Sequence, residues 1–205
     1  MTSGQRHTLD LTLLLGGVRA GKSARAVEIA RANAAGGVLF VATAQGLDDE
    51  MRHRIAMHKA ERPAEWQTLE SPVDLARDID RRLTSESHGA GVVIIDCLTL
   101  WVSNVLLTLA DADDAEAVLA ARMSELIDTM GRHARGDAGA RRWIVVTNEV
   151  GLGIVPSTPL GRRYRDALGR VNRLVASAAS DVTLMVAGLS LPLKAGAPAA
   201  RAASV

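Results

Sequence analysis

A glycine-rich turn between an apolar run and an alanine-rich helical pattern constrains this chain more than any other feature. Residues 13–26 read LLLGGVRAGKSARA, and Gly16-x-x-x-x-Gly21-Lys22-Ser23 matches the phosphate-binding loop (P-loop) pattern. Glycine lets backbone N–H groups curl around a phosphate, and a helix beginning near Lys22 adds unpaired N–H groups and a positive dipole end. A strand–helix turn without a ligand is the alternative. Because a strand is predicted before the motif and a helix after it, we expect a nucleotide here, with Lys22 at its β- and γ-phosphates and Ser23 at Mg2+.

The rest of the chain alternates between short apolar runs and helical patterns. The apolar runs are nearly continuous in hydrophobicity, which is typical of strands buried on both faces of a parallel sheet. Strand and helix alternate, so the sequence predicts an α/β fold with a mostly parallel sheet flanked by helices. The predicted strands are Leu9–Leu15, Val38–Ala42, Val92–Ile95, Trp143–Thr147 and Val182–Ala187, and the predicted helices are Lys22–Asn33, Asp49–Glu61, Pro72–Ser85, Asp114–Ala134 and Leu160–Ala179.

Length and composition fit one domain. The chain has 205 residues and shows no internal repeat, so residues 1–205 are predicted to form a single nucleotide-binding domain. Aromatic residues make up only 2%, so alanine, valine and leucine must fill its core. We expect frayed ends at residues 1–7 and 195–205, and surface turns at 108–117 and 134–141.

Charge and cysteine content argue against several classes of protein. A net charge of +1 gives no reason to expect nucleic acid or an anionic membrane as partner, and Tyr164 and Phe40 are the only Tyr and Phe available to stack on bases. No apolar stretch is long enough to span a bilayer, and MTSGQRHTLD lacks the apolar core of a signal peptide. Cys97 is the only cysteine, so no internal disulfide forms and a cytoplasmic location is expected.

Two acidic residues follow predicted strands. Asp96 ends the run VVIID, where P-loop enzymes place the acid that holds Mg2+ or its water shell. Aspartate also caps helices, and the two roles can coexist. Asn148 and Glu149 follow the next predicted strand. Because the carboxyl ends of parallel strands face the ligand crevice, Glu149 is a candidate for contact with substrate or metal, and a capping role is the alternative.

The stretch 47–70 carries two histidines on one predicted helix. At about 100° per residue, His58 shares a face with apolar side chains, whereas His53 falls opposite among solvent-facing charges. Neighbouring arginines favour the neutral, nucleophilic form of His58. From the residues alone, a histidine half-buried at a helix–sheet contact is favoured over a catalytic one. The face comprises Met51, Ile55, His58 and Arg62; Asp48 or Asp49 caps the helix, and Pro63 ends it.

Together these motifs resemble those of the bifunctional adenosylcobinamide kinase / adenosylcobinamide-phosphate guanylyltransferase family of cobalamin biosynthesis. The matching segments run in the family's order from about residue 11 to Lys194. A P-loop alone would name no family. Far more specific are the block R-I-x-x-H-K-x-x-R-P-x-x-W, which begins at Arg54, and the segment NEVGLGIVP at 148–156.

The resemblance implies a RecA-like P-loop sheet, a homotrimer with sites near subunit contacts, and two reactions. ATP or GTP first phosphorylates the side-chain hydroxyl of adenosylcobinamide. GTP then donates GMP to adenosylcobinamide phosphate, giving adenosyl-GDP-cobinamide and pyrophosphate, with His58 as the covalent GMP carrier. Lys22 supports transfer, and Ser23 and Asp96 hold Mg2+. Nucleotide contacts carry over to Gly17, Val18, Arg19, Ala20, Gly21, Lys22, Ser23, Ala24, Thr43, Ala44, Gln45, Lys59, Ala60, Glu61, Arg62, Glu70 and Asp96.

Two departures from the family pattern and two alternative functions stand beside this reading. Ala20 replaces a common serine, with little effect expected because the backbone forms the cradle, and Asp96 replaces a glutamate found in some members. A kinase-only enzyme and a nucleotide-binding regulatory protein without turnover are the alternative functions.

The apolar segment 97–110 is long for one helix of a small monomer, so it predicts an oligomer contact that buries Trp101 and Leu106.

Overall fold

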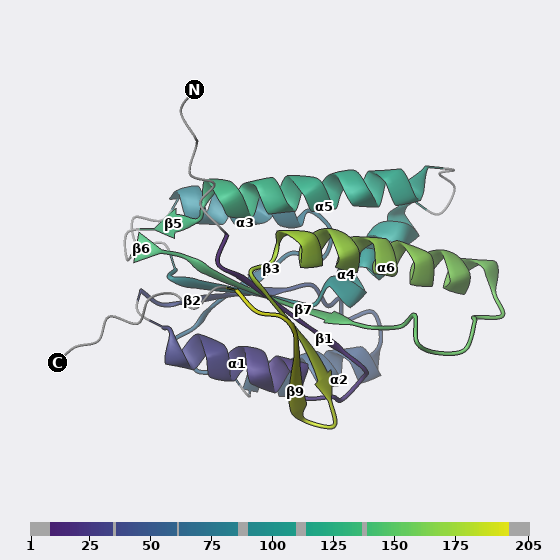
Figure 1. The fold of residues 1–205 in the computed structure, drawn as a ribbon, viewed down its shortest axis with the longest axis horizontal. Coiled ribbons are helices and arrows are strands. Elements are labelled where there is room, and N and C mark those ends of the chain that lie inside the picture. Colours follow the sequence, from purple (N-terminus) through teal and green to yellow (C-terminus); the bar gives the residue numbers. More distant parts are fainter. Residues whose placement is uncertain are drawn as a thin grey trace.

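A seven-stranded sheet forms the centre of the molecule (Figure 1). The computed structural model describes residues 9–34, 36–60, 62–85, 90–109, 114–136 and 139–196, except for the side chains of Arg54 and His58. The strand order is β3-β2-β4-β7-β1-β8-β9, and all pairs are parallel except the β8–β9 hairpin. The strands are β1 (Leu11–Gly16), β2 (Val38–Ala42), β3 (Gln67–Glu70), β4 (Val92–Asp96), β7 (Arg142–Asn148), β8 (Asp181–Val186) and β9 (Leu189–Lys194).

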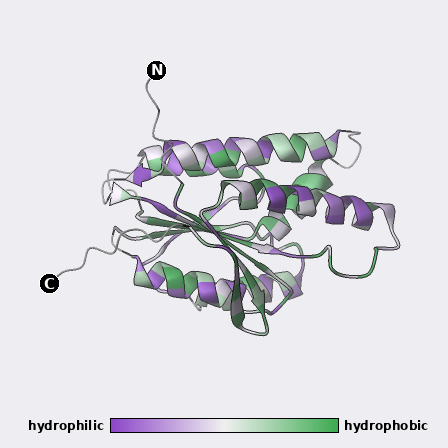
Figure 2. Cartoon of the chain, in the orientation of Figure 1, coloured by the Kyte–Doolittle hydropathy of each residue, from purple (hydrophilic) through white to green (hydrophobic). Residues whose placement is uncertain are grey.

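Helices cover both faces of the sheet. In Figure 1, α3, α4, α5 and α6 lie on one side, and α1 and α2 lie on the other. Figure 2 shows that apolar and polar residues alternate along these helices, as expected when one stripe faces a sheet. The helices are α1 (Lys22–Ala32), α2 (Asp49–Ala60), α3 (Leu75–Ser85), α4 (Leu98–Thr108), α5 (Ala115–Arg132) and α6 (Pro159–Ala178).

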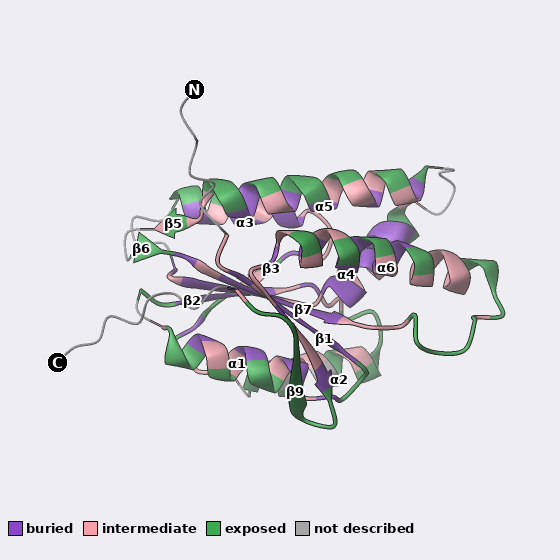
Figure 3. Ribbon diagram, in the orientation of Figure 1, coloured by how far each residue is buried: buried purple, intermediate pink, exposed green. Residues whose placement is uncertain are grey.

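The core is divided by the sheet into two apolar clusters. Val93 and Ile95 of β4 belong to the larger cluster, which includes residues of α3, α4, α5 and α6, whereas Ile94 belongs to the smaller cluster beside α1. This alternation follows from the two-residue period of a strand. Both faces of the inner strands β1, β2, β4 and β7 are therefore apolar and buried, which explains why hydrophobicity along them is continuous, whereas the edge strand β9 is exposed in Figure 3.

The structure confirms the predicted α/β fold and its five predicted strands, whose observed ends lie within two residues of the prediction. The helix expected from Pro72 begins instead at Leu75. Strands β3 and β9 and the short hairpin β5 (Arg135–Gly136) and β6 (Gly139–Ala140) were not predicted; the hairpin occupies an expected turn. Residues 1–8, 110–113 and 197–205 lie outside the described residues, so the frayed ends and the single domain stay predictions.

The prediction that an oligomer contact buries Trp101 and Leu106 is wrong. Both side chains are already buried within one chain, with exposed fractions of 1% and 3%. The indole Nε1 of Trp101 donates to the carbonyl oxygen of Val73 at 2.8 Å. Helix α4 packs between the sheet, α5 and α6, so its apolar run fills the core rather than a subunit contact.

None of the described helices combines the length and the hydropathy that a transmembrane span requires.

Candidate functional site

The P-loop connects β1 to α1 at the carboxyl end of the parallel sheet. Gly16 is the last residue of β1, and a Cβ there would lie 2.3 Å from the carbonyl oxygen of Met185 on β8. Gly21 precedes α1 with φ of 93°, in the left-handed region that favours glycine. The two glycines of the motif are thus required for different reasons, one by close strand packing and one by backbone conformation.

Lys22 is held inside this loop. Its Nζ donates to the carbonyl oxygen of Gly17 at 2.6 Å, and only 7% of the residue is exposed. Burial lowers the pKa of Lys22, while the nearby Cys97 and Asp96 act in the opposite direction. The ammonium group already points across the loop, where a bound phosphate would take the place of the carbonyl as its partner.

The tip of the β8–β9 hairpin supports the P-loop from the other side. The backbone N–H of Gly188 donates to the carbonyl oxygen of Ala20 at 3.2 Å, and its Cα lies 3.4 Å from the Cβ position of Gly21. Ala20 itself is buried, with 7% exposed. Sequence reasoning missed this support, because β9 was not predicted and the contact joins distant parts of the chain.

Asp96 lies at the carboxyl end of β4, between β2 and β7. Helix α4, which follows it, has Cys97 as its N-cap residue and no side-chain cap hydrogen bond. Cys97, and not Asp96, therefore occupies the N-cap position of α4. Its carboxylate instead lines two adjoining pockets.

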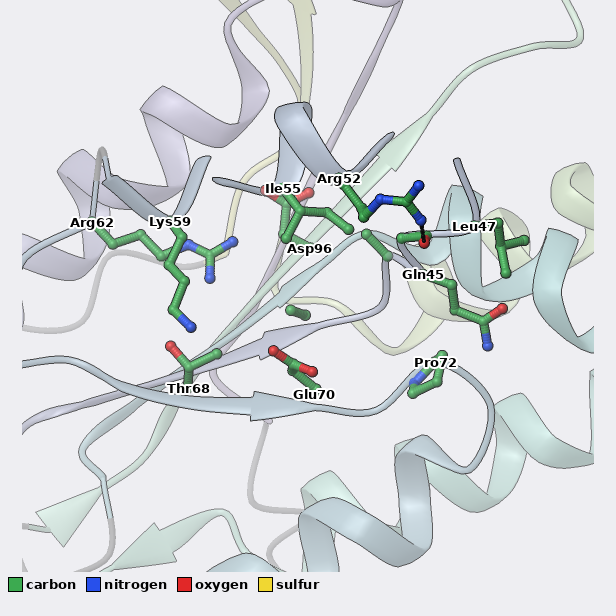
Figure 4. Close-up of a pocket in the computed structure, with 13 residues that line it drawn as sticks. Gln45, Leu47, Arg52, Ile55, Lys59, Arg62, Thr68, Glu70, Pro72 and Asp96 are labelled. Carbon is green, nitrogen blue, oxygen red and sulfur yellow. Dashed lines mark hydrogen bonds between the residues drawn. The ribbon is translucent and has the colours of Figure 1, made fainter. Parts of the chain in front are cut away.

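The larger pocket, of about 690 Å3, opens beside α2 and the ends of β2 and β3 (Figure 4). Arg62, Lys59 and Glu70 extend into the same space in this view. Three basic and two acidic side chains lie in a wall that is otherwise mainly apolar, a combination suited to a nucleotide's phosphates and to the faces of its base. It is lined by Ala42, Ala44, Gln45, Gly46, Leu47, Arg52, Ile55, Lys59, Arg62, Thr68, Glu70, Pro72 and Asp96.

Arg62 joins this pocket to a second one beside α1. Its guanidinium carbon lies 3.5 Å from the centroid of the Phe40 ring, a cation–π contact that fixes the side chain. Burial lowers the pKa of Arg62, opposed first by Asp96 and then by Glu70. The second pocket, of about 350 Å3, is lined by Ser23, Ala24, Val27, Glu28, Arg31, Phe40, Arg62 and Asp96. The two pockets share Arg62 and Asp96 and so form one extended site that reaches the first turn of α1.

The residues predicted to hold Mg2+ fit that ion. Ser23 and Asp96 line the same pocket and supply one hydroxyl and one carboxylate. Mg2+ prefers oxygen ligands and usually keeps several waters, with one or two carboxylates and substrate phosphates completing its shell.

Not every predicted site residue lines the pockets with its side chain. The Thr43 hydroxyl is buried, donating to the carbonyl oxygen of Cys97 at 2.7 Å and accepting from its N–H at 2.8 Å, so it shapes the turn after Asp96. Glu149 accepts a hydrogen bond from the N–H of Gly151 at 2.7 Å within the loop that follows β7, and no helix begins there, so this bond is not a helix cap. Val18 and Arg19 are exposed on the P-loop, Ala60 is exposed at the end of α2, and Glu61 lies outside the described residues.

Helix α2 places its residues largely as the sequence predicts. Asp48 caps the helix, accepting from the N–H of Met51 at 2.7 Å. Ile55 and Lys59, one turn apart, line the larger pocket, and His53 is exposed. The backbone of His58 lies between Ile55 and Arg62 in sequence, but its side chain lies outside the described residues, so its orientation stays a prediction.

Sequence reasoning missed several residues of the larger pocket. Thr68 lies two positions before Glu70, which was predicted, and shares its face of β3, but the short polar run QTLE shows that two-residue period only weakly. Arg52 lies three residues before Ile55 on α2, a helical spacing that puts both on one side. No pattern in the sequence predicts the contact of Phe40 with Arg62.

Some known proteins are similar to this chain in sequence, and others are similar to it in fold. The family model described as "Cobinamide kinase / cobinamide phosphate guanyltransferase" matches residues 12–193. The "Bifunctional adenosylcobalamin biosynthesis protein CobP" of Pseudomonas aeruginosa is 42% identical over 182 residues, which cover 89% of this chain and 96% of that protein. The corresponding CobU protein of Salmonella typhimurium is 39% identical over 90% of this chain and 99% of its own length.

Solved structures share the fold at low sequence identity. The type III secretion ATPase EscN of enteropathogenic Escherichia coli aligns with a TM-score of 0.55 and 14% identity, over 89% of this chain and 47% of that chain. The flagellar accessory protein FlaH of Methanocaldococcus jannaschii aligns with a TM-score of 0.50 and 13% identity, over 91% of this chain and 79% of that chain. These likenesses confirm the P-loop, RecA-like architecture.

Family model and relatives each span nearly the whole chain, P-loop and pocket residues included. The chain therefore belongs to the cobinamide kinase / cobinamide phosphate guanyltransferase family.

Proposed function

We propose that this chain uses one extended nucleotide site for both reactions of its family. As a member of that family, it is a bifunctional cobinamide kinase and cobinamide phosphate guanylyltransferase of adenosylcobalamin biosynthesis. The observation that carries the one-site proposal is that Asp96 and Arg62 line both pockets. A triphosphate in the P-loop and a guanosine in the larger pocket would thus meet at the same two side chains.

In the kinase step, ATP or GTP gives its γ-phosphoryl group to the side-chain hydroxyl of adenosylcobinamide. Phosphoryl transfer depends mainly on positioning and on stabilising charge. Lys22 supplies a desolvated positive charge within the loop, and the backbone of residues 17–24 surrounds the phosphates. Ser23 and Asp96 would hold Mg2+, which neutralises charge on the phosphate oxygens when bound.

In the guanylyl step, His58 is the proposed nucleophile. Its neutral imidazole forms a P–N bond to the α-phosphorus of GTP as the bond to pyrophosphate breaks. A phosphate oxygen of adenosylcobinamide phosphate then displaces the imidazole and receives the GMP. Support comes from α2, whose Ile55 and Lys59 face the larger pocket. The proposed guanosine contacts are Thr43, Ala44, Gln45, Lys59, Ala60, Glu61, Arg62, Glu70 and Asp96, with Thr43 contributing through its backbone.

Assaying the two half-reactions separately tests this function. The protein is supplied with adenosylcobinamide and γ-labelled ATP or GTP, and in a second experiment with adenosylcobinamide phosphate and α-labelled GTP. We expect label in both corrinoid products. Phosphorylation without guanylyl transfer would identify a kinase-only enzyme, and binding of nucleotide without either product would identify a regulatory protein.

A homotrimer in the cytoplasm completes the proposal. Its support is the family resemblance, together with exposed apolar side chains on the β8–β9 hairpin, where Leu189, Leu191 and Leu193 lie at alternate positions of the sheet's edge strand. Light scattering at micromolar concentration is the measurement, and a stable monomer would contradict the trimer.

A further inference from the structure

Besides the β8–β9 hairpin, a second exposed apolar surface follows the carboxyl end of β7. The segment of residues 150–160, here called the apolar segment, joins β7 to α6. Single exposed apolar side chains are ordinary, but several within one short segment point to an interaction. The exposed fractions are 85% for Leu152, 96% for Ile154, 60% for Val155 and 53% for Leu160.

The apolar segment is braced by hydrogen bonds along its length. At its start, the Glu149 carboxylate accepts from the N–H of Gly151 at 2.7 Å. In its middle, Arg162 Nη1 donates to the carbonyl oxygens of Pro156 and Ser157 at 3.1 and 2.8 Å. At its end, the Thr158 hydroxyl caps α6 by accepting from the N–H of Gly161 at 3.2 Å. The apolar side chains are therefore displayed by a preformed loop.

Hydrogen bonds also join the base of the segment to the reaction site. The N–H of Glu149 donates to the carbonyl oxygen of Gly16, the first glycine of the P-loop motif, at 3.2 Å. The N–H of Asn148 donates to the hydroxyl of Thr99 at 2.8 Å, and Thr99 follows Asp96 closely in the chain. On the far side of the segment, the Tyr164 hydroxyl donates to the carbonyl oxygen of Thr99 at 3.2 Å. The segment thus starts beside the phosphate cradle.

A pocket of about 290 Å3 adjoins the segment between α4 and α6. Its wall is mainly apolar, with hydroxyls of Ser103 and Thr158 among the lining residues. The pocket is too small to enclose a large macrocycle, but it can receive one edge of it while the exposed side chains contact the face. The other lining residues are Leu106, Leu107, Leu160, Gly161 and Tyr164.

The larger nucleotide pocket and the apolar segment lie on opposite sides of Asp96 in the sheet. The charged pocket is formed at β2, β3 and α2, whereas the segment follows β7, on the other side of β4. A phosphate acceptor must reach the triphosphate from a direction that the nucleotide leaves open. The β7 side offers that direction together with an apolar surface.

We propose that the apolar segment and its adjoining pocket bind the corrin ring of the substrate, with Leu152, Ile154 and Val155 against the ring. The inference rests on the proposed function, which makes a corrinoid the acceptor. A corrin is a broad macrocycle that carries methyl groups and a fringe of amides, so it matches an apolar surface with hydroxyls at its edge. A second copy of the chain is the other conceivable occupant, and the continuity of the segment with the P-loop favours the substrate.

The test compares two matched double variants, L152S/I154S on the apolar segment and L191S/L193S on β9. Binding of adenosylcobinamide is measured by equilibrium dialysis, which uses the strong absorbance of the corrinoid. We expect L152S/I154S to weaken corrinoid binding and raise the KM for corrinoid at least tenfold. The kcat at saturating corrinoid and the uptake of label from α-labelled GTP should remain close to wild type. The β9 variant changes the proposed subunit contact instead, so its molar mass is measured alongside, and its corrinoid affinity should stay close to wild type even where its molar mass falls.

Unchanged corrinoid affinity in L152S/I154S would overturn the proposal, and a lower molar mass at unchanged affinity would assign the segment to a contact between copies. I154S alone is a second variant that should fold like the wild type. Ile154 is 96% exposed, so its side chain contributes little to the free energy of unfolding. It should weaken corrinoid binding in the same direction, and unchanged affinity would again count against the proposal. If the wild-type protein neither binds nor phosphorylates the corrinoid, the proposed function itself fails.

Discussion

Replacing Lys22 by methionine should cripple both reactions and leave the fold intact. The Lys22 ammonium lies 2.6 Å from the carbonyl oxygen of Gly17 and is 7% exposed, so it acts in a site largely free of water. Removing one such preorganised contact to developing charge costs about 2.7–4 kcal/mol, or roughly 100- to 1000-fold in kcat. We expect that loss in both half-reactions, because one P-loop positions the triphosphate for each.

The same substitution should change the free energy of unfolding by no more than about 1 kcal/mol, since an apolar isostere removes the cost of burying a charge. Gly17 is exposed, so water can replace the bond lost by its carbonyl. Steady-state rates with each acceptor and urea unfolding are the measurements. Lys194→Met is the matched control: Lys194 Nζ donates to the carbonyl oxygens of Ala176 and Ser177 near the end of α6, and its loss should spare catalysis. Unchanged guanylyl transfer in the Lys22 variant would mean that GTP uses a separate site.

Three further predictions concern packing, pH and the pocket wall. Gly16→Ala should lower the free energy of unfolding by about 3 kcal/mol or more, because its Cβ would lie 2.3 Å from the Met185 carbonyl oxygen; urea unfolding measures this, and a change below 1 kcal/mol would contradict the close packing. Burial raises the pKa of Cys97 to about 11 and that of Tyr164 to about 12, so the folded state holds these protons more tightly than the unfolded chain. The free energy of unfolding should therefore keep its full value below pH 9 and fall as the pH rises toward 11 and 12. The contribution of Cys97 to this fall is roughly 2–3 kcal/mol, and unfolding measured as a function of pH should lack it in the Cys97→Ala variant. Arg62→Lys should weaken GTP binding roughly tenfold, because lysine lacks the planar group that lies over Phe40, and calorimetry with unchanged affinity would refute that role.

Local sequence patterns were sufficient to predict the fold and the phosphate loop. The continuous apolar runs predicted buried parallel strands, and the context of Gly16 to Ser23 predicted the P-loop, since both depend on neighbouring residues. Strand β9 was missed because Pro192 interrupts its alternating leucines, a residue tolerated there only because β9 is an edge strand. Trp101 was misread because an apolar run has the same composition in a core as on a subunit contact.

The walls of the site depend on contacts between distant segments. Nothing in the sequence near Phe40 or Arg62 indicates that the two side chains meet, or that Arg62 joins two pockets. The support of Ala20 by Gly188 likewise requires the hairpin to fold back over the loop. For Glu149, the sequence left substrate contact and capping open; the structure shows a hydrogen bond from Gly151 in a loop, and contact with substrate stays a prediction.

The most direct test of the bifunctional mechanism is to map where GMP is held during transfer. The protein is incubated with α-labelled GTP and Mg2+ without corrinoid, and the labelled peptide is identified. We expect label on His58 as a phosphoramidate, stable in base and lost in acid, forming more slowly as lower pH protonates the imidazole. His58→Asn should abolish labelling yet keep phosphorylation of adenosylcobinamide, whereas His53→Asn, at the exposed position on the same helix, should label normally. Label at another residue, or label that persists in the His58 variant, would contradict the mechanism.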